Sequence, residues 1–197
     1  FGKAISKSDA IKHLDLDKNY KYMLFFGIIR KYKGLDILLE AFADTYLQNQ
    51  NLRLIVAGEF YEDEKPYHDL IEEYNLSDSV VLATKFIPDE MVVDYFCAAD
   101  IIVQPYRNAT QSGVTQIAYH FEKPMLVTNV GGLNEIVPNK KVGYVCEPNA
   151  KDVANCLVDF FSKDKEEEFI EGVKEEKSKY SWDKMIKNIK YLHRQLF

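Results

Sequence analysis

Short runs of apolar residues alternate along this chain with stretches in which apolar side chains recur every three or four positions. Residues 22–27 form a continuous apolar run that ends in a glycine, which is typical of a strand buried on both faces. In residues 34–47, leucine and aromatic side chains recur at helical spacing and predict an amphipathic helix. The same alternation predicts further strands at 52–57, 80–84, 101–104, 125–127 and 143–146 and further helices at 8–14, 66–74, 89–98, 113–121 and 150–161.

The order of these elements indicates the fold class. Strands that alternate with helices predict an α/β fold, a doubly wound parallel sheet with helices on both faces. The first helix would be capped by Ser6 or Ser8. Beyond residue 146 the pattern is wholly helical, with a charged segment at 163–179 and a last helix at 181–197, so extra C-terminal helices are expected. The charged run at 165–168 predicts a solvated helical face rather than a metal site.

Composition and charge exclude several classes of protein. With 47% hydrophobic and 13% aromatic residues among 197, the chain has enough apolar side chains for the core of one domain. Its net charge of -6 argues against nucleic acid as a partner, because phosphate backbones are bound by an excess of Lys and Arg. No apolar run is long enough for a transmembrane segment. Cys97, Cys146 and Cys156 lie in apolar runs, which indicates buried thiols in a reducing, cytoplasmic compartment.

The carboxyl ends of the predicted strands lead into unusual loops, and ligands of doubly wound sheets bind at that edge. The loop that begins at Gly27 carries three cations, Arg30, Lys31 and Lys33, just before a predicted helix. Since a helix N-terminus with added cations attracts anions, this loop predicts phosphate binding. A basic, solvent-exposed loop is the alternative. Neither the P-loop pattern nor the dinucleotide-binding glycine pattern occurs in the sequence.

A second loop of small and hydroxyl residues follows the predicted strand at 101–104. Ser112 and Thr115 flank Gly113 at the predicted start of a helix, where exposed N–H groups and a glycine would let a ligand approach closely. This loop predicts a second phosphate cradle. An ordinary N-terminal cap supplied by Ser112 or Thr110 is the alternative.

Two further loops have features of a ligand site. Gly131 and Gly132 permit close backbone approach and are followed by Glu135, although a simple turn would use the same glycines. Phe86 lies beside a proline at another strand end, where a planar base could stack; a place in the hydrophobic core is its alternative. His120 is expected to be a packed or surface histidine rather than a base.

Taken in order, these segments resemble blocks of a known family. Residues 27–43 resemble the motif G-R-x-x-x-x-K-G-x-D-x-L-x-x-A-F, with Lys33, Gly34 and Asp36 in register. Residues 130–137 resemble V-G-G-x-x-E-I-V. The chain thereby resembles the C-terminal domain of retaining family 4 glycosyltransferases, also called glycosyl transferases group 1, over nearly its whole length. The resemblance implies a Rossmann-like domain, one half of a GT-B fold.

The resemblance implies a nucleotide diphosphate sugar, UDP- or GDP-linked, as the donor, with no further cofactor and no metal. Arg30 and Lys33 would neutralise the diphosphate, because its growing negative charge needs fixed cations and dipoles. Gln111 would contact the sugar. The implied catalytic residues are Arg30, Lys33 and Gln111, and the implied donor-binding residues are Gly27, Phe86, Ser112, Gly113, Val114, Thr115, Gln116, Gly131, Gly132 and Glu135.

The sequence departs from the family pattern at two places. Ile28 stands where the family has its arginine. We assign the role of that arginine to Arg30, two positions later, because its side chain is long enough to reach the same place. Two glutamates of the family, one touching the donor sugar and one the ribose, fall at Ala109 and Ile117. Gln111 and Gln116 are the nearby polar substitutes, able to hydrogen-bond hydroxyl groups without a charge.

The resemblance also implies the rest of the enzyme. Residues 1–19 would lead in from a missing N-terminal Rossmann-like domain, residues 20–180 would bind the donor, and residues 181–197 would form a C-terminal helix. The enzyme would transfer a sugar, with retention, to a carbohydrate or lipid-linked acceptor in the cytoplasm or at the inner membrane face, and this chain alone would be inactive. A non-catalytic, degenerate binding module and a nucleotide-sugar epimerase are the alternative functions.

Overall fold

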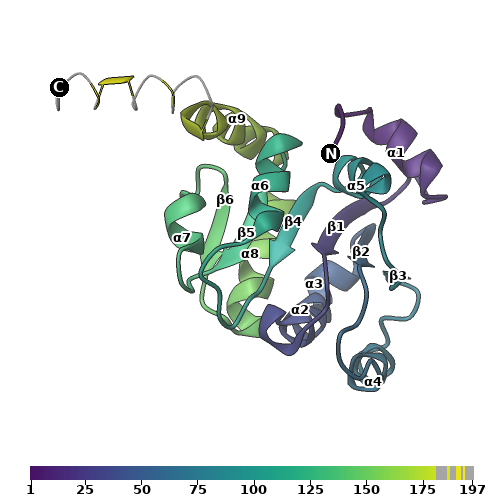
Figure 1. Ribbon diagram of the computed structural model, residues 1–197. Coiled ribbons are helices and arrows are strands. Elements are labelled where there is room, and N and C mark those ends of the chain that lie inside the picture. The colour runs from purple at the N-terminus through teal and green to yellow at the C-terminus, as the bar shows by residue number, and fades with distance from the viewer. Residues whose placement is uncertain (181–185, 187–189, 192, 194–197) are drawn as a thin grey trace.

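Six parallel strands form one sheet in the part of the chain that the computed structural model describes, residues 1–180, 186, 190, 191 and 193. The strand order is β3-β2-β1-β4-β5-β6, and each neighbouring pair is parallel (Figure 1). The strands are β1 (Lys21–Phe26), β2 (Leu52–Ala57), β3 (Val80–Ala83), β4 (Ile101–Gln104), β5 (Met125–Thr128) and β6 (Gly143–Cys146). The predicted doubly wound parallel sheet is confirmed.

Helices cover both faces of this sheet (Figure 1). Successive β1 side chains enter opposite cores, Met23 the one and Leu24 the other, which is why the apolar run is continuous. One face carries α1 (Lys7–His13), α5 (Asp89–Ala98) and α6 (Gly113–His120), and the other carries α2 (Leu35–Phe42), α3 (Thr45–Gln48), α4 (Lys65–Glu73) and α8 (Ala150–Ser162). Shorter or later elements are η1 (Lys31–Lys33), α7 (Leu133–Ile136), α9 (Glu166–Lys177) and η2 (Ser178–Tyr180).

Most element boundaries agree with the sequence prediction to within about two residues. The strands β2, β4 and β6 and the helix α5 have the predicted bounds. Ser6, rather than Ser8, caps α1, because its hydroxyl accepts a hydrogen bond from the Asp9 N–H (3.1 Å). Cys97 and Cys146 are buried as expected, whereas Cys156 is half-buried.

The single helix predicted at 34–47 is wrong, because the chain forms α2 and α3 there. Asp44 starts the second helix, and its carboxylate accepts a hydrogen bond from the Tyr46 N–H (2.9 Å). Phe42 and Leu47 enter the same core from either side of the break, so the apolar spacing conceals it. The short helix α7 was not predicted. The helix expected at 181–197 falls mostly outside the described residues.

A buried cluster of charged groups lies at the amino edge of the sheet. Asp100, fully buried before β4, pairs with Lys7 and accepts a hydrogen bond from the Tyr22 N–H (2.6 Å). The Lys123 ammonium donates to two backbone carbonyls (2.8 and 3.3 Å). At the start of α9, burial and the Asp100 carboxylate raise the pKa of Glu166 to about 7. The predicted solvated face at 165–168 is confirmed for Glu167 and Glu168, which are exposed, whereas Glu166 is half-buried.

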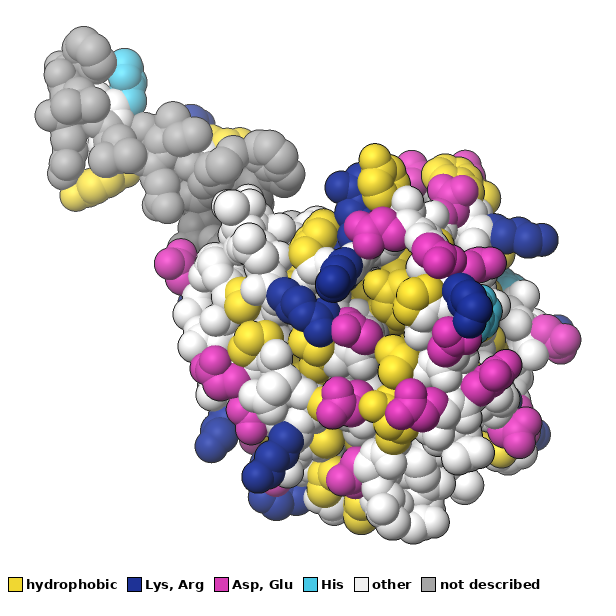
Figure 2. All heavy atoms as spheres, turned by 90° about the horizontal axis from the view of Figure 1, so that it is seen from below, with side chains coloured by type: hydrophobic (Ala, Val, Ile, Leu, Met, Phe, Trp, Pro, Cys, Tyr) yellow, Lys and Arg dark blue, Asp and Glu magenta, His cyan; other side chains and the backbone are white. Residues whose placement is uncertain are grey.

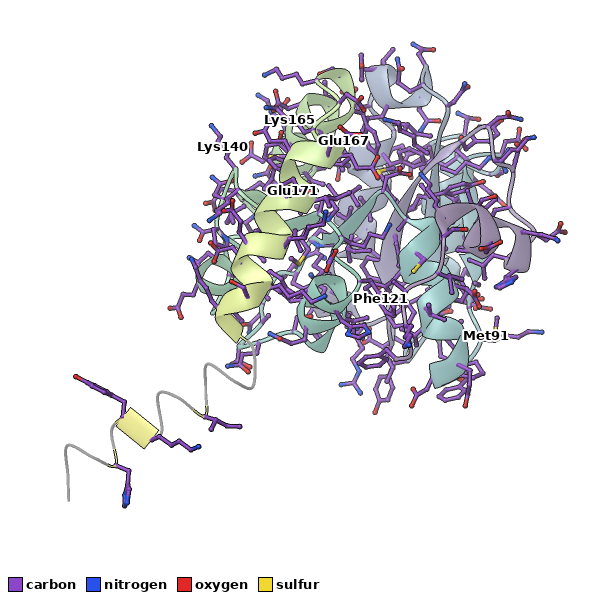
Figure 3. All side chains as sticks on the ribbon, turned by 90° about the horizontal axis from the view of Figure 1, so that it is seen from above. Met91, Phe121, Lys140, Lys165, Glu167 and Glu171 are labelled. Carbon is purple, nitrogen blue, oxygen red and sulfur yellow. The ribbon has the colours of Figure 1, made fainter. Side chains whose placement is uncertain are left out.

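The outer surface carries charges of both signs. On the face shown in Figure 2, Lys and Arg side chains are interspersed with Asp and Glu side chains. Figure 3 shows Lys165 just before α9 and Glu167 and Glu171 along this helix, and the two glutamates are exposed. No helix in the described part of the chain has both the length and the apolar character needed to cross a membrane.

Candidate functional site

A cleft of about 660 Å³ opens at the carboxyl ends of β1 and β4. The strand order reverses between these two strands, which is where doubly wound sheets bind their ligands. Small-molecule sites have volumes of roughly 300–1,000 Å³, so the cleft is large enough for one. The predicted site residues that line it are Gly27, Lys33, Gln111, Ser112, Gly113 and Val114.

Close contacts hold together the two loops that form the walls of the cleft. The Arg107 guanidinium makes a two-pronged ion pair with Asp36 (2.6 and 2.7 Å). The backbone N–H of Arg107 donates a hydrogen bond to the backbone carbonyl of Tyr32 (2.7 Å). Gly34 has a φ of 69°, and a Cβ there would lie 2.1 Å from the Pro105 carbonyl oxygen. Because only glycine fits at this position, the loop after β1 is fixed against the loop after β4.

Lys33 is the charged side chain that lines the cleft, and it is only 9% exposed. Its Nζ packs against Gly27, where a Cβ would lie 3.0 Å away, and is 5.8 Å from the centroid of the Tyr106 ring. Within the described residues, this ammonium has no ion pair or hydrogen bond. Burial, helped by the charge of Arg30, lowers the pKa of Lys33 to about 8. A buried cation without a counterion favours an anionic ligand, so the alternative of a solvent-exposed basic loop is wrong for Lys33.

The N-terminus of α6 faces the same cleft without a side-chain cap. The Ser112 hydroxyl makes no capping hydrogen bond, and nothing lies within 4 Å of a Cβ built on Gly113. In the described part of the chain, the N–H groups of Gly113, Val114 and Thr115 have no acceptor. The alternative of an ordinary cap is therefore wrong, and the partial positive charge of the helix end is open to an anion.

Among the residues that the structure describes, no carboxylate lines this cleft. Ala109 and Ile117, the two positions at which the resemblance led us to expect the family's glutamates, both contribute to its lining as apolar side chains. The described residues contain no group of His, Cys, Asp and Glu side chains that could hold a metal ion. One buried cation, free N–H groups and no acid make the cleft electrostatically suited to an anionic group.

Arg30 and Thr115 lie near the cleft without lining it. The Arg30 guanidinium stacks on the Tyr61 ring, 4.0 Å from its centroid. Its charge still helps to lower the pKa of Lys33. Thr115 is fully buried, and its hydroxyl donates to the Gln104 side-chain oxygen (3.2 Å). Of the two predicted cations, Lys33 alone therefore points into this cleft.

The paired glycines support the loop after β4 instead of lining the cleft. Gly131 has a φ of 52°, and a Cβ there would lie 1.5 Å from the Ala109 carbonyl oxygen. The Gly132 N–H donates to the Thr110 carbonyl (3.1 Å). The close backbone approach expected at these glycines is thus to a neighbouring loop.

The remaining predicted residues lie apart from the cleft. Gln116 and Glu135 are exposed and do not line it. Phe86 is 70% exposed, so its alternative placement in the core is wrong. Its ring lines a separate, mostly apolar pocket of about 330 Å³ together with Met91 and Tyr95.

The sequence interpretation missed Tyr106 and Tyr32, which pack edge to face in the cleft wall with ring centroids 6.0 Å apart. It also missed Asn108 and Thr110 as lining residues. Tyr106 could have been found from its position in the sequence, because it lies two residues after the end of β4, at the edge of the sheet where ligands bind.

The chain belongs to the family Glycosyl transferases group 1, which it matches over residues 6–176. It is 27% identical over 180 residues to an uncharacterized glycosyltransferase of Methanocaldococcus jannaschii, covering 90% of this chain and 49% of that protein. It is 26% identical over 197 residues to the D-inositol 3-phosphate glycosyltransferase of Corynebacterium urealyticum, covering 95% of this chain and 46% of that protein. The chain thus spans about half the length of these curated relatives.

Solved structures have the same fold. Sucrose-phosphate synthase from Thermosynechococcus elongatus matches with a TM-score of 0.81 at 24% identity, over 99% of this chain and 49% of that chain. The C-terminal domain of a glycosyl transferase group 1 family protein from Francisella tularensis matches with 0.79 at 18% identity, over 91% and 95% of the two chains. Anabaena HepE in complex with UDP-glucose matches with 0.75 at 19% identity, over 88% and 48%. The predicted Rossmann-like fold of a GT-B glycosyltransferase half is confirmed.

Proposed function

We propose that this chain binds a UDP- or GDP-linked sugar in the cleft and that the whole enzyme transfers the sugar, with retention, to a carbohydrate or lipid-linked acceptor. Membership of the family supports sugar transfer. The likeness in fold to a structure that holds UDP-glucose supports a nucleotide-sugar donor. In this proposal residues 20–180 bind the donor, residues 1–19 lead in from an N-terminal acceptor domain, and residues 181–197 form a C-terminal helix. The cytoplasm or the inner membrane face stays the predicted location.

One observation carries the proposal: the Lys33 ammonium and the uncapped α6 N-terminus line the same cleft. When the sugar leaves, negative charge grows on the diphosphate, and a fixed cation with fixed N–H dipoles stabilises that charge without a metal. Gln111 at the rim would hydrogen-bond the sugar hydroxyls. Arg30 would add its charge from beside Lys33, and would reach the diphosphate by turning away from Tyr61.

Calorimetric titration with UDP and GDP tests donor binding. We expect Lys33→Met, which keeps the volume of the side chain and removes its charge, to weaken binding at least about tenfold. Lys31→Met is the matched control, because Lys31 is an exposed cation of the same loop that does not line the cleft. Equal affinities for the wild type and the Lys33→Met variant would contradict the proposal.

A second candidate is a binding module that holds a nucleotide sugar without transferring it. The carboxylate-free lining favours this candidate, because Ala109 and Ile117 cannot make charged hydrogen bonds to a sugar or a ribose. In the full-length protein, an enzyme should lose turnover on Gln111→Ala, whereas a binding module has no turnover to lose. Determination of the anomeric configuration of the product by NMR then tests retention.

A further inference from the structure

Ser112 stands at the N-terminal end of α6 and does not cap it. Its backbone is extended (φ -133°, ψ 124°), which is the conformation of a capping residue. Serine is a preferred cap because its hydroxyl accepts a hydrogen bond from the second or third N–H of the helix. In α6 those groups belong to Val114 and Thr115, and the Ser112 hydroxyl accepts from neither.

Tyr106 contacts Ser112 at this open helix end. Its side chain lines the cleft, and its hydroxyl lies 3.4 Å from the Ser112 hydroxyl oxygen, a long hydrogen bond. The tyrosine is itself fixed, because its carbonyl accepts a hydrogen bond from the Thr128 hydroxyl (2.5 Å) and Tyr32 packs against its ring. Burial raises the pKa of Tyr106 to about 12, so its hydroxyl keeps its proton near neutral pH.

We propose that Tyr106 is a positioning residue that holds the Ser112 hydroxyl away from the α6 N–H groups and so reserves these groups for a phosphate of the donor. This inference rests on the proposed function. A Ser112 hydroxyl released from Tyr106 would turn to cap the helix and would compete with the ligand for the same N–H groups. Tyr106 therefore acts on affinity through Ser112.

The test combines Tyr106→Phe, which removes only the hydroxyl, with Ser112→Ala, which removes the competing cap. UDP affinity is measured by calorimetry, and thermal unfolding is measured without nucleotide. We expect Tyr106→Phe to weaken UDP binding roughly three- to tenfold, the size of one capping interaction, without lowering the midpoint of unfolding. In the Ser112→Ala background, Tyr106→Phe should leave the affinity unchanged.

A matched control removes a tyrosine hydroxyl far from the cleft. Tyr144 donates to Asp159 (2.6 Å), and Tyr144→Phe should lower the midpoint of unfolding and leave UDP affinity unchanged. Tyr106→Phe is made both in the wild-type protein and in the Ser112→Ala variant. If it lowers UDP affinity equally in both proteins, or in neither, the inference is overturned while the proposed function stands. If the wild-type chain binds neither UDP nor GDP, the proposed function fails, and the inference fails with it.

Discussion

The two edges of the central sheet differ in how their buried charges are paired. At the amino edge, Asp100 pairs with Lys7 and accepts a backbone N–H, so its charge is compensated. At the carboxyl edge, Lys33 is almost as deeply buried, yet no carboxylate from the described part of the chain lines its cleft. Since unpaired buried groups cost stability, the comparison suggests that the amino edge stabilises the fold and the carboxyl edge is reserved for a ligand.

The largest expected effect is at the amino edge. Asp100→Ala should lower the free energy of unfolding by about 3 kcal/mol, because Lys7 loses its partner and the Tyr22 N–H loses its acceptor. Urea unfolding measures this change. Asp69→Ala is the control and should change stability little, since that exposed carboxylate pairs with Lys65 at the surface. An Asp100→Ala variant as stable as the wild type would contradict the interpretation that the amino edge stabilises the fold.

The next effect is the pH dependence of binding at the carboxyl edge. The pKa of Lys33 is lowered to about 8 from 10.5 in the free protein, and a bound diphosphate would favour the protonated amine. Because Lys33 is mostly protonated at pH 7 and mostly neutral at pH 9, affinity for UDP should fall about tenfold between these two pH values. Titration calorimetry across this range measures the fall, and Lys33→Met should abolish it. Without ligand, stability should rise from pH 8 to 10.5, because the unfolded chain then binds more protons.

Glu166 provides a smaller test, in which stability is expected to fall, rather than rise, as the pH increases. Its pKa is raised from 4.5 to about 7, so the folded protein binds more protons between these values and loses stability as the pH rises through them. Glu166→Gln should make the protein about 1 kcal/mol more stable at pH 8, after allowance for solvent screening, and no more stable at pH 4. Glu167→Gln, an exposed neighbour, should show no such difference in urea unfolding at the two pH values. Equal pH profiles for the Glu166→Gln variant and the wild type would contradict the prediction.

The smallest effect separates the two glutamines beside the cleft. Gln111→Ala should weaken binding of a UDP-sugar about threefold and leave UDP binding unchanged, because only the sugar would lose a hydrogen bond. Gln116→Ala should change neither affinity, since this side chain lies outside the cleft. A larger loss from Gln116→Ala than from Gln111→Ala would reverse this assignment.

The central strands were predictable because both faces of the sheet are buried there, which produces continuous apolar runs such as the one from Tyr22 to Phe25. The break between α2 and α3 was not predictable from spacing. Phe42 and Leu47 continue the apolar pattern across it, and the cap at Asp44 is a local hydrogen bond that competes with the helix.

The loops of the site were predictable, but the directions of individual side chains were not. The loops that carry Lys33 and Ser112 each follow a strand, and parallel strands bring their carboxyl ends to one edge of the sheet. Both loops were therefore predicted to belong to the site, and both line the cleft. Whether Arg30 or Lys33 enters the cleft depends on Tyr61, which belongs to the loop after β2. The burial of Glu166 likewise depends on residues distant in sequence, so both outcomes require the folded chain.

The close approaches at Gly34 and Gly131 have a consequence for how this site can change during evolution. A single added methyl group at either glycine would meet a carbonyl oxygen of the loop that carries Tyr106, so three loops are locked into one mechanical unit. Insertions or altered loop paths would disturb all three at once. New donor preferences should therefore arise by exchange of side chains on this unchanged backbone, at lining positions such as Ala109 and Ile117.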